Sequence, residues 1–177
     1  NFGGKISRLA QISNTFISDT YRFRSTTFTD GVSHLNDLNP DLVAHTGGVV
    51  EEAIPKNYHL ARSLLDKINA PIVFTPASRD INYLGYQLFK ENFGKMDQEY
   101  SLEGVYLKGI SSAQYDSEEG IVGETERARL FQEMNEIGSK MKILFLHHNV
   151  LPIPHSREKG LLEDGGDLLR GSVESEV

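Results

Sequence analysis

Four short apolar runs, each followed by a cluster of small or polar residues, constrain the fold of this chain most strongly. The runs have the length of β-strands, and stretches with apolar residues at helical spacing separate them, which is typical of α/β proteins. In open α/β sheets, ligands bind beyond the carboxyl ends of the strands. We therefore expect four clusters to converge on one site: Ser13-Asn14-Thr15, Thr46-Gly47-Gly48, Ala77-Ser78-Arg79-Asp80 and His147-His148-Asn149.

The same patterns predict the order of the elements. Strands are expected at residues 6–12, 41–45, 72–74 and 143–146, with two short strands between residues 100 and 109. Helices are expected around residues 28–38, 58–68, 86–93 and 130–137. Pro40 ends the first helix because proline cannot continue the hydrogen-bond ladder. The polar tail from Ser156 to Val177 offers only four leucines as anchors, at positions 161, 162, 168 and 169.

Composition limits the class of protein. With 177 residues, the chain is expected to form a single domain, residues 1–177. No apolar run reaches the roughly 20 residues that span a bilayer, and no signal peptide is recognised, so we predict a cytoplasmic location and no membrane partner. Cysteine is absent, which excludes disulfides and thiolate metal sites. The net charge of −7 disfavours bulk attraction to nucleic acid, which is not an expected partner.

The segments that contain these clusters resemble the motifs of calcineurin-like metallophosphoesterases of the compact prokaryotic kind. The first two matching segments are residues 8–16, which resemble the first strand and its Asp-x-His motif, and residues 39–48, which resemble the strand ending in Gly-Asp. Residues 71–80 resemble the strand that leads to Gly-Asn-His-Asp, residues 110–123 the central loop, and residues 143–149 the His-bearing strand. The resemblance runs from about residue 5 to about residue 169. It implies an α/β sandwich, here lacking its C-terminal strands.

The chemistry of these motifs departs from the family pattern. In the family, two metal ions lie between Asp, His, Asn and His ligands, with a bridging Asp and a bridging water or hydroxide. Here the Asp-x-His positions are Asn14 and Phe16, the bridging Asp is Gly48, and the Asn and His of Gly-Asn-His-Asp are Ser78 and Arg79. Family identity is kept only by Asp80, His147 and His148. The closing Gly-His-x-His motif has no counterpart before Val177.

The resemblance with these changes implies a degenerate metallophosphoesterase-like domain that is inactive or impaired. We assign no catalytic residue and expect no metal cofactor. The vestigial site comprises Asn14, Gly48, Ser78, Arg79, Asp80, His147 and His148. Because a guanidinium is always charged and forks onto phosphate, Arg79 is the candidate to bind a phosphorylated small molecule, with Asn14 and His147 beside it. Such a domain acts by ligand binding or as a regulatory or structural subunit.

The alternative is an active metal-dependent phosphodiesterase or phosphatase with a reduced site. It would use His147, His148, Asp80 and Asn14 around a divalent ion (Mn, Fe, Zn or Mg), with His147 and Asn14 as metal ligands. In either case, the absence of the last strands implies an open sheet edge. We expect either that the native chain continues beyond Val177 or that a second copy of the chain or a partner subunit covers this edge.

Three further features receive a structural interpretation. Ser18-Asp19-Thr20-Tyr21 imitates the first family motif, but Asp19 lies too far beyond the strand to reach its mouth. His45 falls inside a strand pattern and is interpreted as a core histidine with satisfied hydrogen bonds. Tyr21, Arg22 and Arg24 form a basic-aromatic patch that we interpret as a solvated loop, with ligand contact as the alternative.

Overall fold

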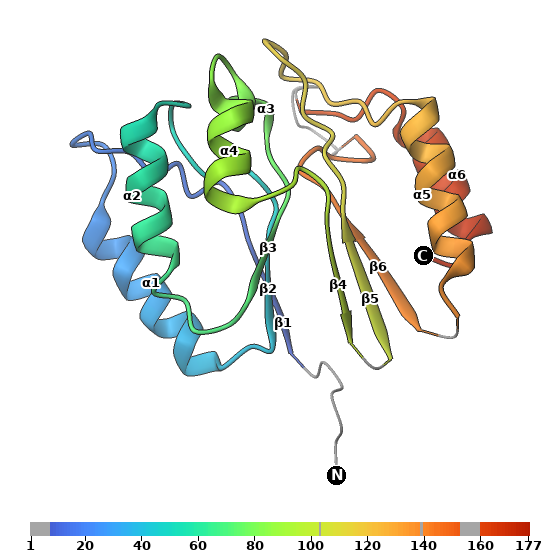
Figure 1. The fold of residues 1–177 in the computed structure, drawn as a ribbon, viewed down its shortest axis with the longest axis horizontal. Coiled ribbons are helices and arrows are strands. Elements are labelled where there is room, and N and C mark those ends of the chain that lie inside the picture. The colour runs from blue at the N-terminus through green and yellow to red at the C-terminus, as the bar shows by residue number, and fades with distance from the viewer. Residues whose placement is uncertain (1–7, 103, 139, 153–159) are drawn as a thin grey trace.

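Two three-stranded sheets, packed face to face, form the centre of the computed structural model, which describes residues 8–102, 104–138, 140–152 and 160–177 (Figure 1). The first sheet has the order β1 (Leu9–Ile12), β2 (Leu42–His45) and β3 (Ile72–Phe74), all parallel. The second has the order β4 (Gln98–Leu102), β5 (Val105–Gly109) and β6 (Met141–Phe145). In it β4 pairs antiparallel with β5, and β6 pairs parallel with β5.

Helices cover the outer face of each sheet, so the layers run helix, sheet, sheet, helix (Figure 1). The first sheet is covered by α1 (Ser25–Leu38), α2 (Pro55–Leu65) and α4 (Gly85–Phe93), and the second by α5 (Glu124–Glu136) and α6 (Gly165–Glu174). The short helix α3 (Ser78–Ile81) follows β3 directly.

Three apolar clusters fill the spaces between these layers. Side chains alternate along a strand, so β2 serves two of them. Val43 packs with the helices that cover the first sheet, whereas Leu42 and Ala44 pack against Leu107 and Phe145 of the second sheet. All four residues of β2 are buried, which explains why this strand is an uninterrupted apolar run ending in a histidine.

The predicted strands and the four predicted helices are present, and the α/β sandwich is confirmed. Within the predicted first strand, residues before Arg8 lie outside the described range. Two helices were not predicted. One is α3, which is too short to show periodicity, and the other is α6, in the tail that the sequence shows only as polar with leucine anchors.

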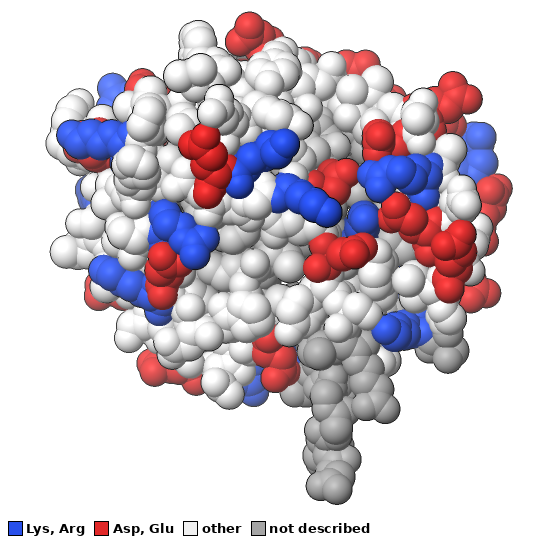
Figure 2. Space-filling model, in the orientation of Figure 1, with Lys and Arg blue, Asp and Glu red and all other residues white. Residues whose placement is uncertain are grey.

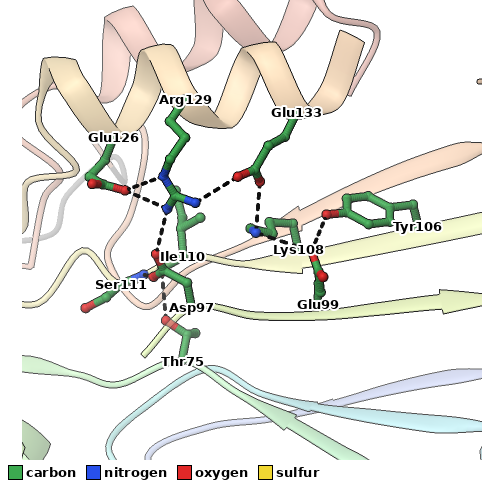
Figure 3. Close-up of polar contacts among 10 residues, drawn as sticks. All are labelled: Thr75, Asp97, Glu99, Tyr106, Lys108, Ile110, Ser111, Glu126, Arg129 and Glu133. Atoms are coloured by element: carbon green, nitrogen blue, oxygen red, sulfur yellow. Dashed lines mark hydrogen bonds and ion pairs between the residues drawn. The ribbon is translucent and has the colours of Figure 1, made fainter. Parts of the chain in front are cut away.

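A network of charged side chains joins α5 to the second sheet (Figure 3). Lys108 of β5, whose side chain is only 7% exposed, lies between Glu99 at 3.4 Å and Glu133 at 2.9 Å. Arg129 contacts Glu133 at 2.8 Å and Asp97 at 3.2 Å. These pairs give the buried lysine its counter-charges. A buried cation without such partners would destabilise the fold strongly.

The two sheets are also joined where β3 meets β4. The side-chain amide of Gln98 accepts the backbone N–H of Phe74 at 2.9 Å and donates to the carbonyls of Phe93 at 2.7 Å and Lys95 at 3.0 Å. The Thr75 hydroxyl donates to the carbonyl of Ile110 at 2.7 Å. This side of β3, which has no strand partner, is therefore closed by side-chain hydrogen bonds.

Strands β1 and β6 are the other outer strands of their sheets. Their cover by a second copy or by a partner subunit stays a prediction. In the part of the chain that the structure describes, no helix combines the length and apolar character that a membrane crossing requires. On the face shown in Figure 2, side chains of both charges are interspersed rather than gathered by sign.

We predict that Gln98→Ala lowers the free energy of unfolding by about 2 kcal/mol. The substitution leaves the N–H of Phe74 and the carbonyls of Phe93 and Lys95 without their hydrogen-bond partners. Chemical denaturation monitored by circular dichroism measures the change. Gln87→Ala is the matched control, since that amide bonds only to Glu91 on an exposed helix face. Equal effects of the two substitutions would contradict the role given to Gln98.

Candidate functional site

A cavity of about 760 Å³ lies at the carboxyl ends of the strands. Its wall includes Asn14 from the loop after β1, Ser78 and Arg79 from α3, and His147 and His148 from the loop after β6. Three of the four predicted clusters therefore line one cavity, whereas Thr46-Gly47-Gly48 is absent from its wall. Asp19 is not among the lining residues: its carboxylate pairs with Lys56, and its backbone N–H donates to Asn57.

The loop after β1 is packed tightly against the loop after β2. The N–H groups of Asn14 and Phe16 donate to the carbonyls of Gly47 at 2.8 Å and Gly48 at 2.9 Å. Gly48 has a φ of +69°, and a Cβ there would lie 2.6 Å from Asn14 Oδ1 and 3.1 Å from the Phe16 ring. A side chain at position 48 would therefore collide with residues 14 and 16.

Asp80 lies beneath the cavity wall and is fully buried. Its carboxylate accepts backbone N–H groups from Gly48 at 2.8 Å, Val49 at 2.8 Å, Val50 at 3.1 Å and Ala77 at 2.9 Å. Burial raises the pKa of Asp80, and the N–H donors and nearby His147 oppose that shift. Asp80 thus binds the loop after β2 to the turn after β3.

Two adjacent histidines follow β6, and their rings are perpendicular with centroids 5.0 Å apart. His147 donates from Nδ1 to the carbonyl of Thr46, the residue after β2, at 2.7 Å. His148 is buried, and its Nδ1 lies 2.8 Å from the Ser112 hydroxyl. Burial, followed by the neighbouring His147, lowers the pKa of His148 to about 4.

His45, at the end of β2, is fully buried, as predicted, but its hydrogen bonds are only half satisfied. Its Nε2 lies 3.1 Å from the Thr15 hydroxyl, whereas Nδ1 has no partner among the residues that the structure describes. Burial and His147 lower the pKa of His45 to about 3. His45 is absent from the cavity wall.

Arg79 projects from α3 into the cavity with 54% of its side chain exposed. Its guanidinium lies 5.4 Å from the centroid of the Phe16 ring, within the range of a cation–π contact. It pairs with Glu51 at 3.5 Å and not with Asp80. Phe16 adopts a left-handed φ of 43°, unusual for a bulky residue, so its loop holds the ring against Arg79 despite a backbone cost.

Several lining residues were not predicted from the sequence. Glu52 and Tyr83 lie in loops between elements, and Glu118 comes from the turn-rich stretch after β5. Tyr83 combines 89% exposure with a φ of 54°. Local composition marks such residues only as solvated loop positions. A non-glycine residue with positive φ is the signal of a special role, and the sequence does not show it.

Comparison with known proteins identifies the fold. No family model matches the chain. A glycerophosphodiester phosphodiesterase of Enterobacter lignolyticus is 25% identical over 154 residues, covering 82% of this chain and 55% of the relative. A dimetal phosphatase from Danio rerio superposes with a TM-score of 0.63 at 9% identity, covering 94% of this chain and 77% of the other. A purple acid phosphatase from yellow lupin seeds gives 0.61 at 8% identity, with coverages of 83% and 31%.

The chain has the calcineurin-like metallophosphoesterase fold. It spans about half the length of the curated relative that it matches.

The two-metal site of a metallophosphoesterase requires a specific set of ligands. Hard cations need several oxygen or imidazole ligands around one point. At that point this chain has no side chain at Gly48, a phenyl ring at Phe16 and a cation at Arg79, and Asp80 is occupied by four N–H donors. In the described ranges, no group of three or more His, Asp or Glu side chains is placed to hold a metal ion. These residues do not fit a metal pair.

We predict that Gly48→Ala destabilises the fold by about 3 kcal/mol, because the added methyl group meets Asn14 and Phe16 on a left-handed backbone. Gly31→Ala is the matched control. Gly31 lies inside α1 with nothing within 4 Å of an added Cβ, so that substitution should stabilise by about 0.5–1 kcal/mol. Thermal unfolding of both variants provides the measurement, and a neutral Gly48→Ala would contradict the packing described here.

The two buried histidines predict a loss of stability in acid. Their folded-state pKa values, about 3 and about 4, lie below the unfolded value near 6.5, so the unfolded chain binds protons first as the pH falls. Stability is intact above pH 6.5, and by pH 5 each histidine should have cost roughly 2 kcal/mol. Urea unfolding at a series of pH values tests this.

His148→Gln should flatten that pH dependence, since it removes one of the two groups. His59→Gln serves as the control because His59 lies on an exposed face of α2. An unchanged slope in His148→Gln would show that other groups cause the acid sensitivity.

Proposed function

We propose that this chain is a metallophosphoesterase-like domain that binds a phosphorylated ligand in its cavity and does not hydrolyse it. The observation that carries the proposal is the packing at position 48. The position at which the family places its shared carboxylate is a glycine enclosed by Asn14 and Phe16. Without that carboxylate, the two metals have no shared ligand at this position. The negative charge that would offset part of the charge of two dications is also missing there.

Arg79 supplies the positive charge for the ligand. Among the described residues its guanidinium bonds to Glu51 through Nη1 alone, so the remaining N–H groups are available to an anion. A guanidinium can donate two parallel hydrogen bonds to a phosphate. Asn14 and His147 line the same cavity and add further hydrogen-bonding groups. The same positive charge opposes the entry of divalent ions.

A phosphoesterase activity is the second candidate, and the similarity to a glycerophosphodiester phosphodiesterase favours it. Such an enzyme would hold a divalent ion with His147 and Asn14, which both line the cavity. Because fold alone does not determine function, this candidate rests on the relative rather than on the donor set of this chain.

One experiment separates the two candidates. The protein is dialysed against Mn²⁺ and then against buffer, its metal content is measured by plasma mass spectrometry, and hydrolysis of bis(p-nitrophenyl) phosphate is followed. We expect substoichiometric metal and no turnover above that of the free ion. Two equivalents of metal with turnover would overturn the proposal in favour of the enzyme.

Phosphate binding is tested on the same protein. Inorganic phosphate should raise the melting temperature, by mass action on the folded state, and Arg79→Gln should abolish the rise. Arg170→Gln is the control, since Arg170 lies on α6 with 73% of its side chain exposed and does not line the cavity. A rise that persists in Arg79→Gln would place the phosphate elsewhere.

A further inference from the structure

A second hollow, of about 470 Å³, adjoins the cavity. It lies between the loop after β1 and the start of α1, and its wall includes Arg22, Phe23, Arg24 and Phe28. Phe16 and Glu51 line both this hollow and the larger cavity. The two spaces therefore meet at the Phe16 ring.

Two arginines without counter-charges line this hollow. Within the described part of the chain, neither guanidinium makes a hydrogen bond or an ion pair, and Arg22 contacts only the Tyr21 ring, at 6.0 Å. The hollow's single carboxylate, that of Glu51, is engaged by Arg79. The chain as a whole has a net charge of −7, so two neighbouring unpaired arginines on one concave wall give this hollow a positive charge that differs from the rest of the chain.

The segment that carries these arginines is held in place by packing. The Phe23 and Phe28 rings lie 5.9 Å apart and pack against the core beneath the first helical layer. Backbone hydrogen bonds from Phe23 to Thr20 and from Phe28 to Arg24 fix the turn that enters α1. The two arginines are thus presented by an anchored turn, and the solvated-loop interpretation explains their exposure but not their shared concave wall.

We propose that the ligand is a small molecule with two phosphate groups, one bound by Arg79 and the other by Arg22 and Arg24. Its carbon skeleton crosses the Phe16 ring, which separates the two cationic positions. The site at Arg79 rests on the proposed function, whereas the arginine pair is an independent observation. A monophosphate satisfies only one of the two positions and leaves the other cation unpaired.

Isothermal titration with fructose 1,6-bisphosphate and fructose 6-phosphate tests this inference. We expect the bisphosphate to bind about tenfold or more tightly than the monophosphate, because a second charge-assisted contact adds to the first. The double variant Arg22→Gln/Arg24→Gln should remove that preference, whereas monophosphate binding that depends on Arg79 should remain. Arg170→Gln should alter neither affinity, and unliganded melting temperatures of all variants verify that they fold.

The outcomes separate this inference from the proposed function. Equal affinities for the two sugar phosphates, or a preference that survives in the double variant, would overturn the two-phosphate inference while Arg79-dependent phosphate binding stands. Bisphosphate binding that depends on Arg22 and Arg24 but not on Arg79 would overturn the proposed function and reduce the inference to one anion site. As a second measurement on the unmodified protein, bisphosphate affinity should fall more steeply with added salt than monophosphate affinity.

Discussion

The Asp80 carboxylate, bound by four backbone N–H groups, is the interaction on which the site depends. Three of these groups belong to residues 48–50, in the loop after β2, and the fourth to Ala77, in the turn after β3. Successive N–H groups that point at one carboxylate require a specific loop backbone, and this loop adopts it with glycines at φ +85° and +69°. Asp80 thereby sets the position of Gly48, and through Gly48 the positions of Asn14 and Phe16.

This arrangement gives Asp80 a structural role in the site. A carboxylate whose oxygens accept four N–H groups is already solvated by the backbone, and it is buried away from the cavity. In the family pattern the histidine that precedes this aspartate faces the metals, whereas here Arg79 leaves α3 toward Phe16 and Glu51. Asp80, which matches the family motif, therefore supports the loops. Arg79, which departs from the motif, faces the cavity.

The order of the elements along the chain and the meeting of strand ends could be predicted from sequence because each depends on a local pattern. Apolar runs of strand length end in polar clusters, and parallel strands bring their carboxyl ends to one side. Tyr83, Glu52 and Glu118 could not be predicted, because loop conformation and packing between distant segments decide whether an exposed polar residue lines a cavity. The half-satisfied His45 escaped prediction for a similar reason, since its partner Thr15 lies 30 residues away. Helix α6 packs against α5, but glycines at positions 165, 166 and 171 disfavour a helix locally, so the sequence alone did not indicate it.

The residues that depart from the family pattern contact one another in the structure. Asn14 Oδ1 occupies the space beside Gly48 that a side chain would need, so the glycine and the amide fit together. Phe16 offers its ring face to Arg79, so the phenyl ring and the cation fit together as well. Restoring a carboxylate at position 48 alone would meet both neighbours, and restoring a histidine at position 79 alone would leave Phe16 and Glu51 without their contact. Contacting residues are expected to couple energetically, so building the family's metal site on this chain would require several substitutions made together.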